Sequence, residues 1–99
     1  IIMDPPSYGR GANGEVWQFE NNIYDLVELC TKVLSDNPLF FLINSYTTGI
    51  SSMVLANILN LTVNKEHKGI IQAGEIGLPM EKSSLVLPCG IFGRWEQKN

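Results

Sequence analysis

The chain has 99 residues, enough for one small domain, and 44% of them are hydrophobic, a content typical of globular proteins rather than disordered ones. Seven lysines and arginines stand against ten acidic residues, and this net charge of −3 disfavours a free-standing nucleic-acid binder, which would present a basic face. No apolar run approaches the ~20 residues of a membrane-spanning helix, so we expect no membrane partner and a cytoplasmic location.

The chain offers little for a metal or a disulfide. Cys30 falls on an apolar helical face and Cys89 follows a proline in an apolar strand, so we expect two buried free thiols. The single histidine, His67, lies in a charged stretch, and no Cys-x-x-Cys pair occurs. We therefore predict no metal site.

The first predicted element is a short strand, Ile1–Met3, which leads into Asp-Pro-Pro-Ser-Tyr at positions 4–8. Two successive prolines end the hydrogen bonding of a strand and leave backbone carbonyls free. Ligands of open α/β sheets bind beyond the carboxyl ends of the strands. Asp4, the Pro5 carbonyl and the Tyr8 ring there suit a flat base that bears an amino group. An ordinary turn is the alternative.

A loop is predicted from Asp4 to Gly14, and its last six residues match the spacing G-x-G-x-x-G. A dinucleotide-binding turn needs its first glycine directly after the strand, but five residues with two prolines intervene here, so we reject that interpretation. A mobile lid is a second interpretation, in which Arg10 reaches a phosphate or carboxylate of the substrate. A solvated loop is equally favoured.

A helix is predicted from about Asn21 or Asn22 to Leu34 by apolar residues at helical spacing. Two aromatic residues, Trp17 and Phe19, precede it. They suit either a clamp over a target base or packing of the chain against the sheet, and we favour packing.

The second half of the chain begins with a continuous apolar run, Leu39–Ile43, which predicts a strand buried on both faces. The loop Asn44–Gly49 follows at its carboxyl end. Further along, we expect a helix from Ser51 or Ser52 through about Leu61, a polar turn at Asn64–Lys68, and strands at Gly69–Ile76 and Leu85–Phe92.

These segments together resemble the class I S-adenosylmethionine (SAM)-dependent methyltransferases. Asp-Pro-Pro-Ser-Tyr at positions 4–8 resembles their motif IV, in the Asp-Pro-Pro-x-aromatic form of a family of 23S ribosomal RNA base methyltransferases. Asn44–Gly49 lies where that family carries motif VI, and Leu87–Trp95 resembles the closing strand. The resemblance implies an α/β fold, the C-terminal half of a Rossmann-like sheet, with the order β-α-β-α-β-β and an antiparallel last strand.

The resemblance also implies roles for individual residues. It implies that the catalytic residues are Asp4, Pro5, Pro6 and Tyr8, with Asp4 also touching the cofactor SAM. It implies that the substrate-binding residues are Ser7, Arg10, Asn44, Ser45 and Tyr46. The implied partner is a nucleic acid, ribosomal RNA.

No Gly-rich loop for the methionine part of SAM, and no acid for its ribose, precedes Asp4. We therefore expect residues 1–99 to be a partial methyltransferase domain that starts at the fourth strand, lacks the cofactor-binding N-terminal half and is inactive alone. Because the strand Ile1–Met3 would then lack its usual neighbour, we expect the isolated chain to self-associate across this edge and to bind SAM weakly or not at all.

Ser45 bears on the chemistry. Methylation at carbon 5 of a pyrimidine requires a thiolate, and the resembling family carries that cysteine in its motif VI loop. Serine is a far poorer nucleophile without an activating base, and neither Cys30 nor Cys89 is predicted to replace it. We therefore prefer methylation of a nitrogen, by direct in-line transfer, over cytosine C5. The alternative is a catalytically silent methyltransferase-like module used for binding or assembly.

Overall fold

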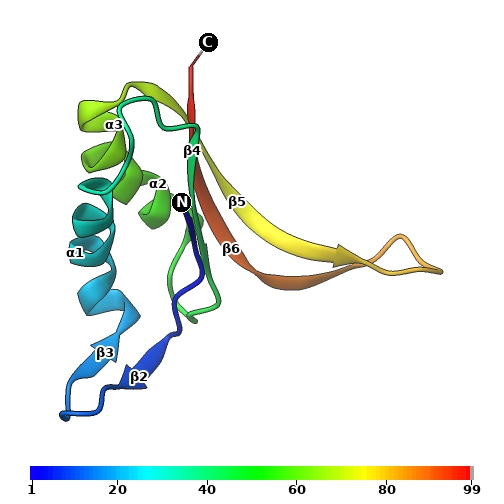
Figure 1. The fold of residues 1–99 in the computed structure, drawn as a ribbon. Helices are drawn as coiled ribbons and strands as arrows, with labels where there is room; N and C mark the ends of the chain where they lie inside the picture. The colour runs from blue at the N-terminus through cyan, green and yellow to red at the C-terminus, as the bar shows by residue number, and fades with distance from the viewer. Residues whose placement is uncertain (99) are drawn as a thin grey trace.

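Four strands form one mixed sheet, and helices cover one side of it in the computed structural model, which describes residues 1–98 (Figure 1). In chain order the elements are β1 (Ile2–Met3), β2 (Tyr8–Arg10), β3 (Val16–Gln18), α1 (Phe19–Thr31), β4 (Phe40–Ser45), α2 (Ser52–Leu61), α3 (Val63–Glu66), β5 (Gly69–Pro79) and β6 (Val86–Gln97).

The order of strands in the sheet is β1-β4-β6-β5. The first pair is parallel, with Met3 opposite Ile43, whereas β6 lies between β4 and β5 and runs antiparallel to both. Because β1 and β4 run in the same direction, their carboxyl ends meet at one edge of the sheet. The segments that follow them are therefore brought close together.

The predicted element order lacked three elements. The expected loop Asp4–Gly14 contains β2, which pairs with β3 in a separate two-stranded sheet, and the expected polar turn Asn64–Lys68 contains most of α3. The hairpin forms because Gly11 and Glu15 close the turn with a backbone hydrogen bond of 2.8 Å. Helix α3 forms because Val63 adds a fully buried side chain to the core.

Helix α1 begins at Phe19 and ends at Thr31, so both predicted ends were too late. At the start, the side chain of Asn22 accepts a hydrogen bond of 2.8 Å from the Gln18 backbone and so lies inside the helix instead of preceding it. At the end, the backbone N–H groups of residues 32–34 bond to carbonyls three residues earlier, a tighter turn than the α-helix.

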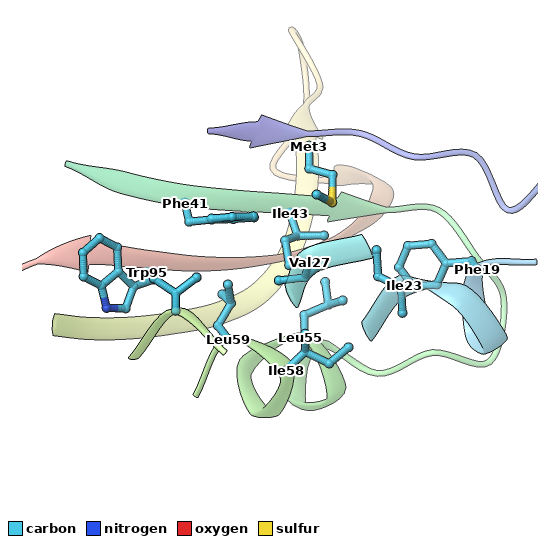
Figure 2. Close-up of a cluster of buried hydrophobic side chains, with 11 residues drawn as sticks. Met3, Phe19, Ile23, Val27, Phe41, Ile43, Leu55, Ile58, Leu59 and Trp95 are labelled. Atoms are coloured by element: carbon cyan, nitrogen blue, oxygen red, sulfur yellow. The ribbon is translucent and has the colours of Figure 1, made fainter. Parts of the chain in front are cut away.

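One hydrophobic core joins the sheet to the helices (Figure 2). Its members are Met3, Phe19, Ile23, Val27, Phe41, Ile43, Leu55, Ile58, Leu59, Val63 and Trp95. Phe19 belongs to it, which confirms packing as the role of that ring.

Strand β4 was predicted to be buried on both faces. This prediction is wrong, because among residues 1–98 only one face of the strand is fully covered. Phe41, Ile43 and Ser45 are buried against the helices, whereas the alternate residues facing the other way are half-buried. Both cysteines are free and half-buried, so the expectation of two fully buried thiols is also wrong.

Strands β5 and β6 continue far beyond their contact with β4 and form a projecting ribbon (Figure 1). We call residues 76–90 the arm. A backbone hydrogen bond of 3.0 Å from Met80 to Leu85 closes the hairpin, and a shift in register next to Gly77 leaves Cys89 without an opposite residue. The arm contributes to extents of 44 × 44 × 18 Å. No helix within residues 1–98 has the length and hydropathy of a membrane span.

Candidate functional site

The parallel strands β1 and β4 bring Asp4 and Tyr46 together at the carboxyl edge of the sheet. Asp4 is exposed, and the Tyr46 side chain is 55% exposed. The negative charge of Asp4 is the main reason that the pKa of Tyr46 is raised above its ordinary value of 10.0, and partial desolvation adds to this effect. The carboxylate and the phenol ring thus share one environment, although 42 residues separate them in the sequence.

A direct hydrogen bond joins the two loops of this edge. The hydroxyls of Ser7 and Thr47 lie 2.8 Å apart. Beside this bond is an open pocket of about 600 Å³, lined by Ser7, Tyr8, Gln18, Glu20, Tyr46, Thr47, Thr48, Gly49 and Ile50. Three of the predicted site residues, Ser7, Tyr8 and Tyr46, therefore line one cavity.

The β2–β3 hairpin holds the segment that follows Asp4. The indole N–H of Trp17 donates to the Pro6 carbonyl at 2.7 Å, and the backbone N–H of Phe19 donates to the Ser7 carbonyl at 3.0 Å. Within residues 1–98 no hydrogen bond to the Pro5 carbonyl forms, whereas the Asp4 carboxylate faces the Tyr46 hydroxyl, whose hydrogen bond to Asp4 contributes to the raised pKa of Tyr46. The Pro5 carbonyl is thus free to accept a hydrogen bond from a base, and a base that binds Asp4 would share that carboxylate with the Tyr46 hydroxyl.

Arg10 lies on β2 beside Tyr8, and its Nε donates to the Tyr8 hydroxyl at 3.1 Å. It lines a second depression, between the hairpin and α1, and not the pocket between the two loops. The glycine-rich stretch is an ordered turn rather than an open loop. There the Glu15 carboxylate accepts the Asn13 backbone N–H at 3.0 Å, and the pKa of the carboxyl is lowered first by the backbone N–H of Glu15 itself and then by that of Asn13.

Asn44 and Ser45 belong to strand β4 and precede the loop in which we expected them. Successive strand residues point to opposite faces, so these two side chains cannot both reach one ligand. Ser45 is fully buried, and its hydroxyl accepts the Thr47 backbone N–H at 3.2 Å. This arrangement favours a structural role for Ser45, whereas Tyr46 reaches the pocket.

The sequence did not predict that β6 contributes residues beside Tyr46 to the candidate site. Gly90, at the base of the arm, has φ of +145°, and a Cβ there would lie 2.6 Å from the Ser45 carbonyl oxygen and 2.7 Å from the Tyr46 ring. The neighbouring Cys89 lies close enough to add to the raised pKa of Tyr46. A glycine inside an apolar strand, two residues after a proline, was the available signal of close backbone approach.

The residues present fit only part of a SAM site. Within residues 1–98, two exposed carboxylates lie at this edge of the sheet, Asp4 beside Tyr46 and Glu20 in the lining of the pocket, and there is no cluster of metal-ligating side chains. The arrangement suits one contact with the cofactor, together with a pocket for the group that receives the methyl.

A comparison with solved structures supports a methyltransferase-like fold. The chain is similar to the SAM-dependent methyltransferase from Agrobacterium tumefaciens, with 28% sequence identity and a TM-score of 0.85. The match covers 98% of this chain and 32% of that protein, so the chain spans about a third of its length. No protein-family model matches the chain, and no curated protein matches it.

Proposed function

We propose that this chain belongs to a SAM-dependent methyltransferase and forms the part of the catalytic domain that holds the methyl acceptor. The observation that carries the proposal is the joining of the Asp4 and Tyr46 segments at the carboxyl edge of two parallel strands. Such edges are where ligands of open α/β sheets bind. The likeness to a SAM-dependent methyltransferase over almost the whole chain supports the same reaction class.

The chemistry of the pocket and of the strand end beside it favours a nucleic-acid base as the acceptor, although Asp4 and Pro5 are not among the residues that line the pocket. Tyr8 and Tyr46 expose 53% and 55% of their surfaces and offer flat faces for stacking. The Asp4 carboxylate and the Pro5 carbonyl can each accept a hydrogen bond from an amino group. In keeping with the family that the chain resembles, we propose a base of ribosomal RNA.

Nitrogen is the acceptor atom that we propose. Bound SAM supplies an electrophilic methyl group, and an amino or ring nitrogen needs only to be held in line with it, while its proton leaves to an acceptor such as Asp4. Methylation at carbon 5 would require a thiolate. Ser45 is buried at the end of β4, where its hydroxyl accepts the Thr47 backbone N–H, and the Cys89 thiol donates to the Leu87 carbonyl at 3.3 Å.

The charge of the chain limits what it can contribute to RNA binding. A net charge of −3 gives little attraction for phosphates, so in this proposal most phosphate contacts come from other parts of the enzyme. The chain would hold the base, and the rest of the protein would hold the backbone.

The experiment uses the longest natural form of the protein with radiolabelled SAM on bulk RNA, DNA and protein. We expect label in RNA, and Asp4→Ala should lower the rate by at least about 100-fold. Asp36→Ala, an exposed acid at the opposite edge of the sheet, is the matched control and should retain activity. Label confined to protein, or an undiminished rate with Asp4→Ala, would contradict the proposal.

A catalytically silent module would give another result. Calorimetry with SAM, performed on the same natural form, would then show no binding and no label would enter any substrate. Heat of binding together with label in RNA would exclude that alternative.

A further inference from the structure

The segment that follows β1 cannot fix its own backbone. Pro5 and Pro6 carry no N–H group, so neither can donate a hydrogen bond to a neighbouring strand. Among residues 1–98 the backbone of this proline pair makes one hydrogen bond, which the Pro6 carbonyl accepts from the indole N–H of Trp17 at 2.7 Å. Strand β1 ends before the prolines, and the bonds of Ser7 begin after them. Trp17 is therefore the residue that holds the middle of the segment.

This single bond also restricts the Pro5 carbonyl. The peptide bond between Pro5 and Pro6 is planar, and the ring of Pro6 locks its own φ. The only soft backbone dihedral between the two carbonyl groups is therefore the ψ of Pro6. A donor that fixes the Pro6 carbonyl leaves the Pro5 carbonyl a single rotation. The Pro5 carbonyl is also the one that is free to accept a hydrogen bond from a base.

Trp17 is itself held by the hairpin and by the hydrophobic core. It lies on β3, where it pairs with Gly9 of β2, and its half-buried ring packs against the core. Strand β3 leads directly into α1 (Figure 1), whose first residue, Phe19, is fully buried. The core thus sets the position of the indole N–H, and the hydrogen bond passes that position on to the proline pair.

The ring of Trp17 is not placed to cover a base in the pocket. It lines the depression between the hairpin and α1, and it is not among the residues that line the pocket beside Tyr46. Packing alone does not require the hydrogen bond either. The indole N–H of Trp95 is buried in the core without a hydrogen-bond partner among residues 1–98. What distinguishes Trp17 is its bond to Pro6.

We propose that Trp17 is a positioning residue, whose indole N–H holds the proline pair so that the Pro5 carbonyl faces the methyl acceptor. The inference rests on the proposed function, because it assigns Trp17 a role in that same site. In-line transfer depends on geometry, and a displacement of about 1 Å can cost about 100-fold in rate. Loss of the bond should therefore lower the rate at saturating substrates rather than weaken the binding of SAM.

The test compares Trp17→Phe with Trp95→Phe in the longest natural form of the protein, supplied with labelled SAM and bulk RNA. Both substitutions keep an aromatic ring and remove an indole N–H, but only the N–H of Trp17 has a partner. We expect Trp17→Phe to lower kcat at least about tenfold while the KM for SAM stays within about twofold. Trp95→Phe should destabilise the fold and yet keep kcat when assayed below its melting temperature.

A change of packing is separated from loss of the bond by an isosteric replacement. Benzothienylalanine keeps the shape of tryptophan but has sulfur in place of the indole N–H. Placed at position 17, it should reproduce the loss of kcat seen with Trp17→Phe. It also serves as the test if Trp17→Phe does not fold, which circular dichroism decides.

A second readout does not depend on activity. Asp4 directly precedes the prolines, and its charge raises the pKa of Tyr46. Release of the segment in Trp17→Phe should let Asp4 move away from the phenol, so the pKa of Tyr46 should fall toward 10.0. NMR of isotope-labelled tyrosine measures this pKa, with Tyr46→Phe to assign the signal. Trp95→Phe should leave it unchanged.

Wild-type kcat in the benzothienylalanine variant would overturn the inference. So would an equal loss of kcat in Trp95→Phe, or an unchanged pKa of Tyr46 in folded Trp17→Phe. Absence of label from RNA in the wild-type enzyme would instead contradict the proposed function, and the pKa of Tyr46 would then decide by itself whether Trp17 holds the segment.

Discussion

Strand β6 runs through two environments, and the contrast between its ends shows what determines burial in this fold. Trp95, at the inner end, is 1% exposed, whereas Leu87, at the outer end, is 56% exposed. Both are large apolar residues in the same strand. The difference is that α2 covers the inner end, where Gly93 lets Leu55 approach closely, and no helix within residues 1–98 covers the outer end. The candidate site lies at the boundary between these regions, beside Gly90.

The sharpest test of this contrast is Trp95→Ala against Leu87→Ala. Removing the buried indole leaves a cavity and should cost about 3–5 kcal/mol of the free energy of unfolding. Leu87 loses little burial, so its truncation should cost less than about 1 kcal/mol in dilute solution. Urea denaturation measures both. Equal losses would show that the arm is covered as well as the body.

A pair of glycine substitutions gives the next largest effect. A Cβ at Gly93 would lie 2.7 Å from Leu55 Cβ, so Gly93→Ala must push α2 away and should cost about 1–3 kcal/mol. At Gly77, on the arm, a Cβ would overlap the exposed Val86 side chain and touch the Leu87 carbonyl oxygen, so only the arm has to adjust and no helix has to move. Gly77→Ala should therefore cost less than Gly93→Ala. The same denaturation series compares them, and a cost at Gly77 as large as that at Gly93 would contradict the open arm.

A smaller effect, on the pKa of Tyr46, is expected beside Gly90, where the inner and outer ends of β6 meet. Asp4→Asn removes the charge that raises the pKa of Tyr46, so this pKa should fall toward 10.0. Absorbance of tyrosinate during an alkaline titration measures the change. Asp25→Asn, on α1, is the control. An unshifted Tyr46 would show that the two loops are not joined as described.

The interaction between Asp4 and Tyr46 also makes the free energy of unfolding depend on pH in a defined direction. Because the pKa of Tyr46 is higher in the folded chain than in the unfolded one, the folded state holds the phenolic proton more tightly. The contribution of Tyr46 to the free energy of unfolding is fully present below pH 10 and is lost as the pH rises through the raised pKa of its phenol. Asp4→Asn should reduce this loss, as measured by urea denaturation at pH 8 and pH 11, and a loss as large as in wild type would contradict the assignment.

The central strand β4 could be predicted from the sequence more fully than the β2–β3 hairpin beside it. The apolar run before Asn44 identified β4, because a short run bounded by turns is typical of a central strand. It did not reveal that the faces of β4 are unequally covered, since that depends on which helices lie on each side. The hairpin of β2 and β3 was missed because a glycine-rich stretch between polar residues has no strand periodicity, and its turn depends on the Glu15 side chain.

The site was partly predictable for a similar reason. Local motifs placed Asp4 and Tyr46 directly after strands, as in the structure, and singled out Tyr8, which lines the same pocket as Tyr46. The hydrogen bond between Ser7 and Thr47 joins residues 40 apart and depends on strand pairing. The close approach of Gly90 to Tyr46 depends on β6 returning between β4 and β5, which no local pattern encodes.

The proposed function requires the Asp4 and Tyr46 segments to form one base-binding site for transfer of a methyl group to nitrogen. The most direct measurement is mass spectrometry of nucleosides from bulk RNA treated with the longest natural form of the protein and SAM carrying a deuterated methyl group. We predict label on an amino or ring nitrogen, abolished by Asp4→Ala and retained by Cys89→Ser. Label on carbon 5 of a pyrimidine that disappears with Cys89→Ser would contradict the account.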